Sequence, residues 1–336
     1  MMLDMTESSD KRPTLRSLAE ITGLGISTVS QALRNSPEIA SETRVRVQLA
    51  ARQMGYRPNR AGVRLRTGKT NVIALVLNAH DDGSGFFANM VYGISEALKS
   101  TPYHLVVTPY SLADPMESVR YIVETNSADG VIISRTEPND ARVRYLADNG
   151  MPFATHGRTE MGIEHAYFDF DNETFAFEAL RILAAKGRKH IALVSPPPSL
   201  NYYHHTLKGF DRGLTEFGLT GFMLGTVNTD SQIHEMQRAG LELAQRKDRP
   251  NGIICASSSV ALAVISGLTK GRLRIGHDYD MVAKPMTDLV LMAQPEIIGM
   301  DEDFSRAGQE LVRMVMQRIA GTEPIVLQIV DQPKPH

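Results

Sequence analysis

The 336-residue sequence predicts an α/β protein, with a small all-helical N-terminal domain ahead of a larger core of two doubly wound parallel-sheet lobes. Apolar residues recur at helical spacing between residues 15 and 54, whereas short apolar runs alternate with helical stretches from residue 71 onwards. The run HIALVS at 190–195 repeats the pattern of VIALVL at 72–77, so we expect two similar lobes.

Composition narrows the class of protein. Hydrophobic residues make up 42% of the chain, and no apolar run reaches the roughly 20 residues that span a bilayer. The opening residues MMLDMTESSDKR carry acids and do not resemble a signal peptide. The single Cys255 excludes an intramolecular disulfide and zinc-finger spacing. We therefore expect a cytoplasmic protein.

Charge is distributed unevenly along the chain. Residues 1–69 hold 12 basic and six acidic side chains, a net charge of +6, whereas the remaining residues have a net charge of −8. A basic head on an acidic body suggests a polyanionic partner for the head alone. The alternative is a solvated helical surface, which would carry the same charge.

Three helices are expected in this head. Thr14 is the predicted N-cap of LRSLAEIT, and a tight turn at 23–25 leads into a helix from Ile26 to Leu33. Ser41 is the predicted cap of a third helix that ends at Gly55. Two short helices joined by a tight turn are typical of a helix-turn-helix.

The glycines of GLGIST at 23–28 raise a competing interpretation, a dinucleotide-binding loop. That motif needs a preceding strand and a third glycine, whereas here a helix precedes and Thr28 takes the third position. Short hydrogen-bonding side chains on the second helix suit base edges and phosphates, so we predict that it contacts DNA. The alternative is a helical hairpin inside a core.

From residue 71, expected strands alternate with helices, one of which begins at Phe86. The expected strands are 71–78, 104–110, 130–134, 152–155, 190–195, 252–257, 275–278, 297–300 and 325–330. Two such lobes should enclose a cleft at the carboxyl ends of their strands, which is the natural small-molecule site.

The sequence divides into three expected regions, a headpiece at 12–58, a basic linker at 59–70 and the two-lobed core at 71–336. Within the core we expect an N-lobe made of 71–170 and 279–302, and a C-lobe made of 171–278 and 303–336. The linker has too little apolar surface to pack alone, so on composition it is a disordered basic segment.

Enzyme signatures are missing from the core. It contains no G-x-S-x-G, no H-E-x-x-H and no phosphate-binding loop, so we predict neither catalysis nor a cofactor. The run YYHH at 202–205 could form a metal cluster, but adjacent histidines seldom point at one ion from a loop. We favour an aromatic binding loop or surface loop and predict no metal site.

Between residues 28 and 70 the chain contains the motifs TVS, ALRNSP, SETRVRV, GYRPN and LRTGKT. In these motifs the headpiece and linker resemble those of the LacI/GalR family of bacterial transcription regulators. The rest of the chain resembles the same family's two-lobed effector domain, whose fold is like that of a periplasmic binding protein.

The resemblance implies that the helix from Ile26 enters the major groove of DNA. Ile26 and Ser27 match the main base-reading positions and Gln31 a third, where Gln suits a bidentate contact with adenine. Gly25 replaces the usual serine, so a helix-capping hydroxyl is missing. The predicted DNA-binding set is Thr14, Ile26, Ser27, Thr28, Ser30, Gln31, Arg34, Asn35, Asn59, Arg60, Arg64 and Leu65.

The resemblance also gives the linker a role. In the family it becomes a helix only on DNA, where two copies lie in the minor groove and a leucine wedges a central base step. Leu65 takes that position here, and Gly62 replaces the usual alanine, which should loosen the free linker.

The effector positions depart from the family's pattern. Thr206 replaces the arginine that grips the effector, and Ser257-Ser258 replaces an Asn-Asp pair, whereas Asp278 is retained. Arg135 or Arg158 could substitute for the missing arginine, and a surface ion pair is the alternative for each. A carboxylate beside aromatic rings suits a sugar. The predicted effector-binding set is Phe86, Phe87, Arg135, Arg158, Tyr202, Thr206, Ser257 and Asp278.

Together these features imply a homodimeric repressor of a carbohydrate-utilisation operon, which binds a near-palindromic DNA operator and is released by a small sugar. One alternative is a regulator whose DNA binding is tightened by a non-sugar co-repressor. A solute-binding protein of the same fold is disfavoured by the basic helical head. An α/β enzyme with a DNA tether is disfavoured by the missing enzyme signatures.

Overall fold

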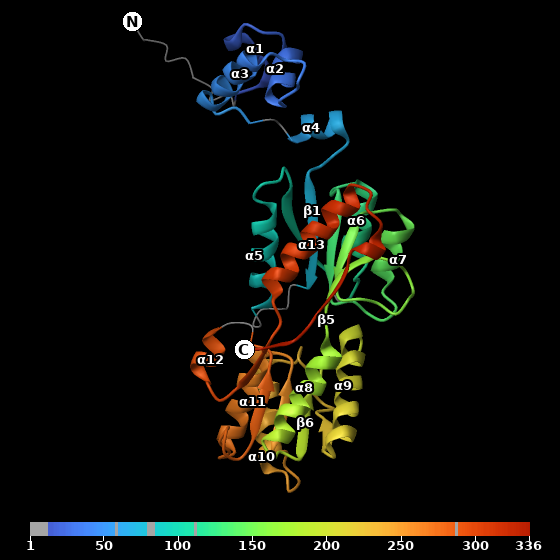
Figure 1. Ribbon diagram of the computed structural model, residues 1–336, viewed down its shortest axis with the longest axis vertical. Coiled ribbons are helices and arrows are strands. Elements are labelled where there is room, and N and C mark those ends of the chain that lie inside the picture. Colours follow the sequence, from blue (N-terminus) through green and yellow to red (C-terminus); the bar gives the residue numbers. More distant parts are fainter. Residues whose placement is uncertain (1–12, 58–59, 79–84, 111–112, 286–287) are drawn as a thin grey trace, which may run out of the picture. The chain divides into compact units, whose positions relative to one another are not determined.

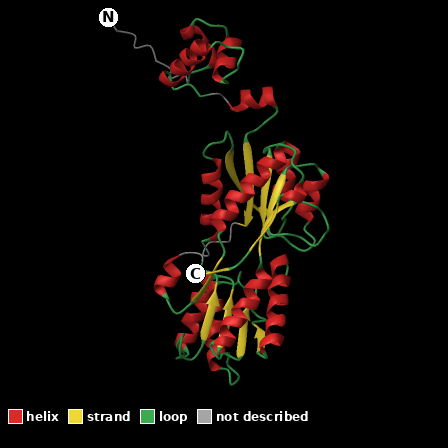
Figure 2. Ribbon diagram, in the orientation of Figure 1, coloured by secondary structure: helices red, strands yellow, loops and turns green. Residues whose placement is uncertain are grey.

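The computed structural model describes residues 13–57, 60–78, 85–110, 113–285 and 288–336. The chain divides into two compact units, Met1–Thr70 and Asn71–His336. Figure 2 shows helices alone in the first unit and alternating helices and strands in the second. The predicted fold class is therefore confirmed.

The first unit is built on three packed helices (Figure 1), α1 (Leu15–Thr22), α2 (Ile26–Leu33) and α3 (Ser41–Gln53). A short fourth helix, α4 (Arg60–Thr67), follows them. The apolar stripes of the first three meet in one core, formed by Leu18, Ala19, Val29, Ala32, Val47 and Ala51. Helices this short do not persist alone in water, so shared burial holds them together.

Local sequence sets the ends of these helices. Thr14 caps α1 as predicted, because its Oγ1 accepts a hydrogen bond from the Ser17 amide at 3.1 Å. Gly23 then takes a φ of 66°, the left-handed conformation that commonly ends a helix. The prediction for Ser41 is wrong. Ser41 is the first residue of α3, and Ala40 before it has no side-chain oxygen with which to cap the helix.

One six-stranded parallel sheet, in the order β11-β5-β4-β3-β1-β2, forms the N-lobe of the second unit. Helices α5 (Phe86–Leu98) and α13 (Phe304–Ile319) cover one face, and α6 (Glu117–Thr125) and α7 (Ala141–Asp148) cover the other. The strands are β1 (Val72–Asn78), β2 (His104–Tyr110), β3 (Gly130–Ser134), β4 (Phe153–His156), β5 (Ala166–Phe170) and β11 (Gln328–Asp331).

The C-lobe has a second six-stranded sheet, in the order β12-β10-β9-β8-β6-β7, whose strands are parallel except β12. Helices α8 (Asn172–Ala185) and α9 (Asn201–Phe217) cover one face. Helices α10 (Ile233–Gln245), α11 (Ser258–Lys270) and α12 (Asp288–Ala293) cover the other. The strands are β6 (His190–Val194), β7 (Thr220–Met223), β8 (Gly252–Cys255), β9 (Asp280–Ala283), β10 (Ile298–Asp301) and β12 (Lys334–Pro335).

The predicted division of the core between lobes is wrong at its C-terminal end. Residues 279–302 contain β9 and β10, which pair within the C-lobe sheet. The next helix, α13, packs closely on α5 of the N-lobe (Figure 1), since a Cβ added to Gly93 would lie 2.0 Å from the Ser305 carbonyl oxygen. β11 then joins the N-lobe sheet beside β5. The chain therefore crosses between the lobes at 170–172, 301–304 and 331–334.

The predicted strand at 275–278 is also wrong. Gly276 lies in a turn, with a φ of 77°, and its amide donates a hydrogen bond to the Tyr279 carbonyl at 2.7 Å. The strand, β9, begins at Asp280 beyond this turn. At 325–330, a 3₁₀ turn over Pro324–Val326 comes first, and β11 begins only at Gln328. The short strands β5, β7 and β12 were not predicted from the sequence.

Candidate functional site

Helix α2 presents a polar face on the headpiece. Val29 and Ala32 are fully buried against the other helices, whereas Ile26 is 50% exposed. Of the other predicted α2 contacts, Ser27 and Arg34 are exposed, and Thr28, Ser30 and Gln31 are half-buried. The helix begins after Gly25 without a side-chain cap. Its first-turn N–H groups therefore remain available for a negatively charged partner.

Two of the predicted DNA-binding residues have structural roles in the headpiece. The Thr14 hydroxyl caps α1. Asn35 has a φ of 57°, and its Oδ1 accepts a hydrogen bond from Gln48 Nε2 at 2.6 Å. Asn35 thus connects the end of α2 to α3. Of its side-chain polar atoms, Nδ2 is the one that can donate to a phosphate.

The linker is helical in this structure. Leu65 is 90% exposed on α4, and a Cβ added to Gly62 would meet no atom within 4 Å. Arg60 is the first residue of α4 and Arg64 is exposed, whereas the predicted contact Asn59 lies outside the described residues. An exposed helix of two turns is marginal alone, so folding coupled to DNA binding stays a prediction.

In the second unit, the carboxyl edges of the two sheets meet. We call the residues that follow these strand ends the interlobe edge, which comprises 134–142, 156–158, 169–172, 195–201, 228–231, 284 and 302. Arg135 follows β3 of the N-lobe, and its guanidinium forms a bidentate ion pair with Asp230 in the loop between β7 and α10 of the C-lobe.

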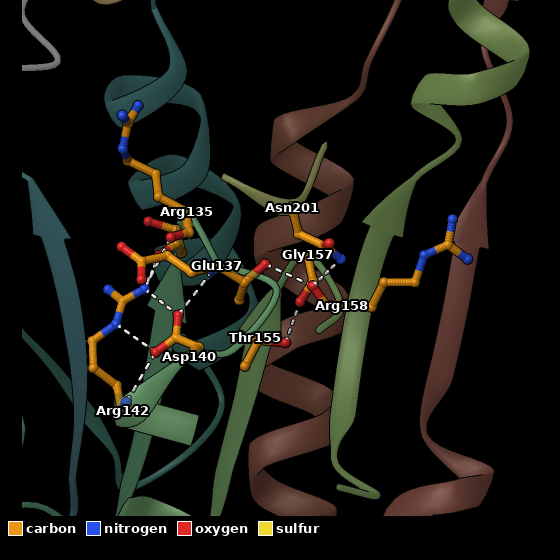
Figure 3. Close-up of polar contacts among 10 residues, drawn as sticks. Arg135, Glu137, Asp140, Arg142, Thr155, Gly157, Arg158 and Asn201 are labelled. Atoms are coloured by element: carbon orange, nitrogen blue, oxygen red, sulfur yellow. Dashed lines mark hydrogen bonds and ion pairs between the residues drawn. The ribbon is translucent and has the colours of Figure 1, made fainter. Parts of the chain in front are cut away.

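A buried ion pair holds the loop that carries Arg135. The side chains of Arg142 and Asp140 are 5% and 2% exposed, and they contact each other at 2.6 Å. Arg142 Nη2 also donates to the Arg135 carbonyl at 2.9 Å. Burial alone would raise the pKa of Asp140, but the hydrogen bonds and charge of Arg142 outweigh burial and hold that pKa below its ordinary value. Figure 3 shows the Arg135 side chain extending away from this pair.

Asn201, the first residue of α9, joins the C-lobe to two N-lobe loops (Figure 3). Its backbone amide donates to the Thr136 carbonyl at 2.8 Å, and its Nδ2 donates to the Arg158 carbonyl at 2.8 Å. The Thr136 hydroxyl donates to the same Arg158 carbonyl at 2.9 Å. These bonds fix the backbone of two loops that sequence analysis considered for effector binding.

Arg158 pairs with Asp169, a residue of β5. The distance from Arg158 Nε to Asp169 Oδ2 is 2.9 Å, but the angular geometry is not that of a hydrogen bond, so Coulomb attraction is the main contribution. Burial raises the pKa of Asp169 to about 6, although the Arg158 charge opposes the shift.

A further buried ion pair lies beside Asp169. Lys284 Nζ contacts Glu302 Oε2 at 2.6 Å and Asn172 Oδ1 at 2.8 Å, and it lies 4.0 Å from the centroid of the Phe170 ring. Lys284 follows β9 and Glu302 follows β10, so this ion pair lies where the chain crosses between lobes. This ion pair was not predicted from the sequence, although a lysine directly after an apolar strand was an available signal.

The aromatic pair predicted on α5 is split. Phe86 is buried, with ring centroids 4.9 Å from Phe304 and 5.6 Å from His156. Phe87, the next residue, is 43% exposed. Burial lowers the pKa of His156, which keeps the imidazole neutral near pH 7. Ser257 lies two residues after β8, at the expected strand end.

Three predicted effector residues are placed differently from the expectation. Asp278 precedes β9 and lies at the amino edge of the C-lobe sheet, where it accepts a hydrogen bond from the Arg274 amide at 2.8 Å. Thr206 is fully buried and its hydroxyl donates to the Tyr202 carbonyl. Tyr202 lies in the first turn of α9 and not in a loop. The assignment of Asp278 is therefore wrong, because the site was expected at the opposite edge of that sheet.

Other kinds of site find little support in the described part of the chain. A small cavity at the amino edge of the N-lobe is lined by Phe153, His165, Arg318 and neighbouring residues, and no predicted effector residue lines it. Among the described residues, no group of three or more His, Cys, Asp or Glu side chains is placed to hold a metal. None of the described helices combines the length and apolarity needed to cross a membrane.

A headpiece with an exposed polar helix, attached to a two-lobed α/β domain, defines a DNA-binding regulator that carries a small-molecule domain. Residues 14–59 match the family of bacterial regulatory proteins of the lacI type, and residues 70–333 match the periplasmic binding proteins and sugar binding domain of the LacI family. The chain belongs to the LacI family and is a transcriptional regulator, not an enzyme.

Named relatives cover most of the chain. The HTH-type transcriptional regulator AglR of Rhizobium meliloti (strain 1021) is 34% identical over 84% of this chain and 80% of its own length. RafR of Escherichia coli is 33% identical over 95% of this chain and 96% of its own.

Solved structures support the same fold. The transcriptional regulator CelR in its cellobiose complex superposes with a TM-score of 0.70, at 25% identity over 97% of this chain and 98% of its own. The lac repressor dimer bound to operator and the anti-inducer ONPF has a TM-score of 0.82, at 20% identity over 96% of this chain and 97% of its own.

Proposed function

We propose that the protein is a cytoplasmic, homodimeric repressor of a carbohydrate-utilisation operon, and that a small neutral sugar releases it from its operator. The observation that carries the DNA half is the exposed polar face of α2, packed by its apolar face onto α1 and α3. A rigid short helix with hydroxyl and amide side chains suits readout in a major groove. The CelR–cellobiose complex supports a sugar as the effector class.

Polar atoms at the interlobe edge support a ligand rich in hydroxyls. Ser134 Oγ, His156 Nε2 and Asn201 Oδ1 are buried and have no hydrogen-bond partner among the described residues. Buried polar atoms are costly unless they are paired, and sugar hydroxyls both donate and accept hydrogen bonds. Phe86 beside His156 adds an aromatic surface of the kind that contacts the C–H face of a sugar ring.

Charge balance separates a neutral effector from an acidic co-repressor. The interlobe arginines Arg135 and Arg158 would favour an anion if they were free. Each is paired with a carboxylate, Asp230 and Asp169 respectively, so the pairs are close to neutral. This pairing favours a neutral sugar over the alternative of a DNA complex tightened by an acidic metabolite.

A coupled equilibrium would connect the two sites. An effector that binds one lobe arrangement better would shift the linkers of the dimer and change their ability to fold on DNA. A tenfold change in operator affinity needs only about 1.4 kcal/mol of such coupling.

A mobility-shift titration tests this proposal. The DNA upstream of the protein's own gene should be retarded at physiological salt in preference to random duplex, and removal of residues 1–69 should abolish retardation. Addition of glucose, galactose, cellobiose, maltose, melibiose or raffinose should reverse it for at least one sugar. Equal binding to random duplex would refute the regulator, and indifference to every sugar would refute the effector class.

A further inference from the structure

We propose that Arg135 and Asp230 form the polar clamp of the effector site, in which the Asp230 carboxylate accepts hydrogen bonds from two neighbouring hydroxyls of a neutral sugar and Arg135 orients that carboxylate. This inference rests on the proposed sugar response and names the residues that would produce it. It also gives the C-lobe a carboxylate at the correct edge of its sheet, where the sequence had suggested Asp278.

The pair joins the two lobes directly. Arg135 Nη1 donates to Asp230 Oδ1 at 3.2 Å, and Nη2 donates to Oδ2. The Arg135 side chain is 13% exposed and that of Asp230 is 40% exposed. The guanidinium is thus largely covered by protein, while the carboxylate remains open to a ligand. A carboxylate has about four lone-pair sites, so a bidentate arginine leaves capacity for two hydroxyl donors.

The protein holds Arg135 in place at a conformational cost. Its φ of 56° lies in the left-handed region, which is unfavourable for a residue with a Cβ. The buried Arg142–Asp140 pair supports this conformation, since Arg142 Nη2 donates to the Arg135 carbonyl. Strained backbone that surrounding contacts enforce is concentrated at ligand-binding positions.

The loop of Asp230 is fixed by contacts within the C-lobe. The Asp230 amide donates to Asn228 Oδ1 at 2.9 Å, and the Asn228 amide donates to Ser231 Oγ at 3.0 Å. The Thr229 amide donates to the Ser195 carbonyl at 3.0 Å, which ties the loop to the end of β6. Both partners are therefore held by backbone contacts before any ligand binds, which lowers the entropy cost of binding.

Two buried polar atoms lie on residues next to, or bonded to, the loop of Arg135. Ser134 precedes Arg135 in the chain, and Asn201 bonds to Thr136 directly after it. Ser134 Oγ and Asn201 Oδ1 are buried and lack hydrogen-bond partners among the described residues. Such atoms favour a ligand with hydroxyl groups, which can both donate and accept hydrogen bonds.

The test compares three variants with the parent in full-length protein. The probe is whichever neutral sugar of the mobility-shift panel releases the parent from operator, and its direct binding is measured by calorimetry. Asp230→Asn and Arg135→Gln should each raise the sugar concentration for half-release at least tenfold and weaken direct sugar binding by a similar factor. The matched control is Asp248→Asn, which breaks a bidentate Arg246–Asp248 pair within the C-lobe and should change neither quantity.

The exchange variant Arg135→Asp/Asp230→Arg distinguishes the proposed clamp from a latch, by which we mean an ion pair that only holds the two lobes together and does not contact the sugar. The exchanged pair can re-form across the lobes, and Asp tolerates a positive φ better than Arg. A latch would regain the sugar response, whereas a clamp would not, because the carboxylate is then on the wrong lobe. Restored response in the exchange, or an unchanged sugar affinity in Asp230→Asn, overturns the clamp alone. If the parent binds operator but no sugar releases it, the proposed effector fails and the clamp fails with it.

Discussion

At the scale of single residues, the buried carboxyl of Asp169 makes the stability of the core depend on pH. Burial raises its pKa from 3.8 to about 6, so between these values the folded state binds a proton that the unfolded state has lost. The contribution of Asp169 to the free energy of unfolding therefore rises as the pH falls through 6. At pH 7 the ionised carboxyl lowers the free energy of unfolding by roughly 2–3 kcal/mol. Asp169→Asn should remove that cost.

We expect Asp169→Asn to be more stable than the parent at pH 7, with the advantage shrinking as the pH approaches 4.5. Urea unfolding of the core, followed by circular dichroism at pH 4.5, 6 and 7, measures the difference. Arg181→Gln, which breaks an exposed pair with Glu178 outside the interlobe edge, is a suitable control. A stability difference that stays constant over this pH range would show that Asp169 ionises as an ordinary surface carboxyl.

Asp278 provides a second residue-scale prediction. It hydrogen-bonds to the Arg274 amide at the amino edge of the C-lobe sheet, away from the interlobe edge. Asp278→Ala should therefore leave both operator affinity and sugar response within twofold of the parent, with at most a small loss of stability from the turn. The mobility-shift titration measures both quantities. A lost sugar response with intact DNA binding would return Asp278 to the effector site.

The errors at Asp278 and Asp230 show which parts of a site local sequence can reveal. HDYD at 277–280 combines a turn with the start of a strand, and a polar turn next to apolar residues was mistaken for a strand end. Asp230 lies in a polar loop with no local signal, and its partner Arg135 is 95 residues away. Strand ends predicted Arg135 and Arg158, but only the folded structure identifies their partners. Asp230 lies in the other lobe, and Asp169 lies in the N-lobe sheet itself.

At the scale of elements, α4 is the helix whose function depends on an exposed apolar side chain. Leu65 is 90% exposed, so Leu65→Ala removes almost no burial from the free protein. If Leu65 wedges a base step, the substitution should weaken operator binding by at least tenfold, about 1.4 kcal/mol, without changing the sugar affinity or the melting temperature. A mobility-shift titration and a thermal melt measure these effects.

A matched control for Leu65 is available in the second unit. Leu289 on α12 is 71% exposed, and Leu289→Ala should leave operator affinity unchanged. Equal operator binding by Leu65→Ala and the parent would contradict the wedge role and leave α4 as a spacer.

The contact between α5 and α13 is the element-scale basis of the corrected lobe boundary. A Cβ at position 93 would lie 2.0 Å from the Ser305 carbonyl oxygen, so Gly93→Ala must push the helices apart. We expect a loss of about 1–3 kcal/mol in the stability of the core, as for other overpacked sites. Gly62→Ala is the control, since a Cβ there meets open space. Equal melting temperatures for the two variants would show that α13 is not packed on α5 in solution.

Helix patterns and apolar strands were predictable because their signals are local, whereas lobe membership was not. HIALVS, GIICAS and IIGM each lie in a strand, but nothing in an isolated strand states which sheet it joins. α13 follows β10 of the C-lobe directly in sequence, yet it packs on α5, more than 200 residues earlier. Close packing at Gly93 determines the lobe to which α13 belongs, and no local sequence pattern predicts that packing.

At the scale of the whole molecule, the proposed dimer needs a surface on each protomer. β2 is an edge strand of the N-lobe sheet, and its Val106 and Val107 are 45% and 38% exposed. Tyr92 on the adjoining helix α5 is 60% exposed. Exposed apolar side chains on neighbouring elements are typical of a protein interface. A two-fold contact there would pair two headpieces and so match a near-palindromic operator.

Val107→Asp tests that surface, because it would place two like charges in a symmetric interface. We expect a monomer by sedimentation velocity at micromolar concentration, and operator affinity should fall at least a hundredfold, since each headpiece then binds without the effective concentration supplied by its partner. Met223→Asp is the matched control, because Met223 is 39% exposed on β7, the edge strand of the C-lobe sheet. That variant should stay dimeric. If Val107→Asp sediments as the parent does while Met223→Asp dissociates, the dimer contact belongs to the C-lobe, and the effector would then act on the headpieces through a different part of the molecule.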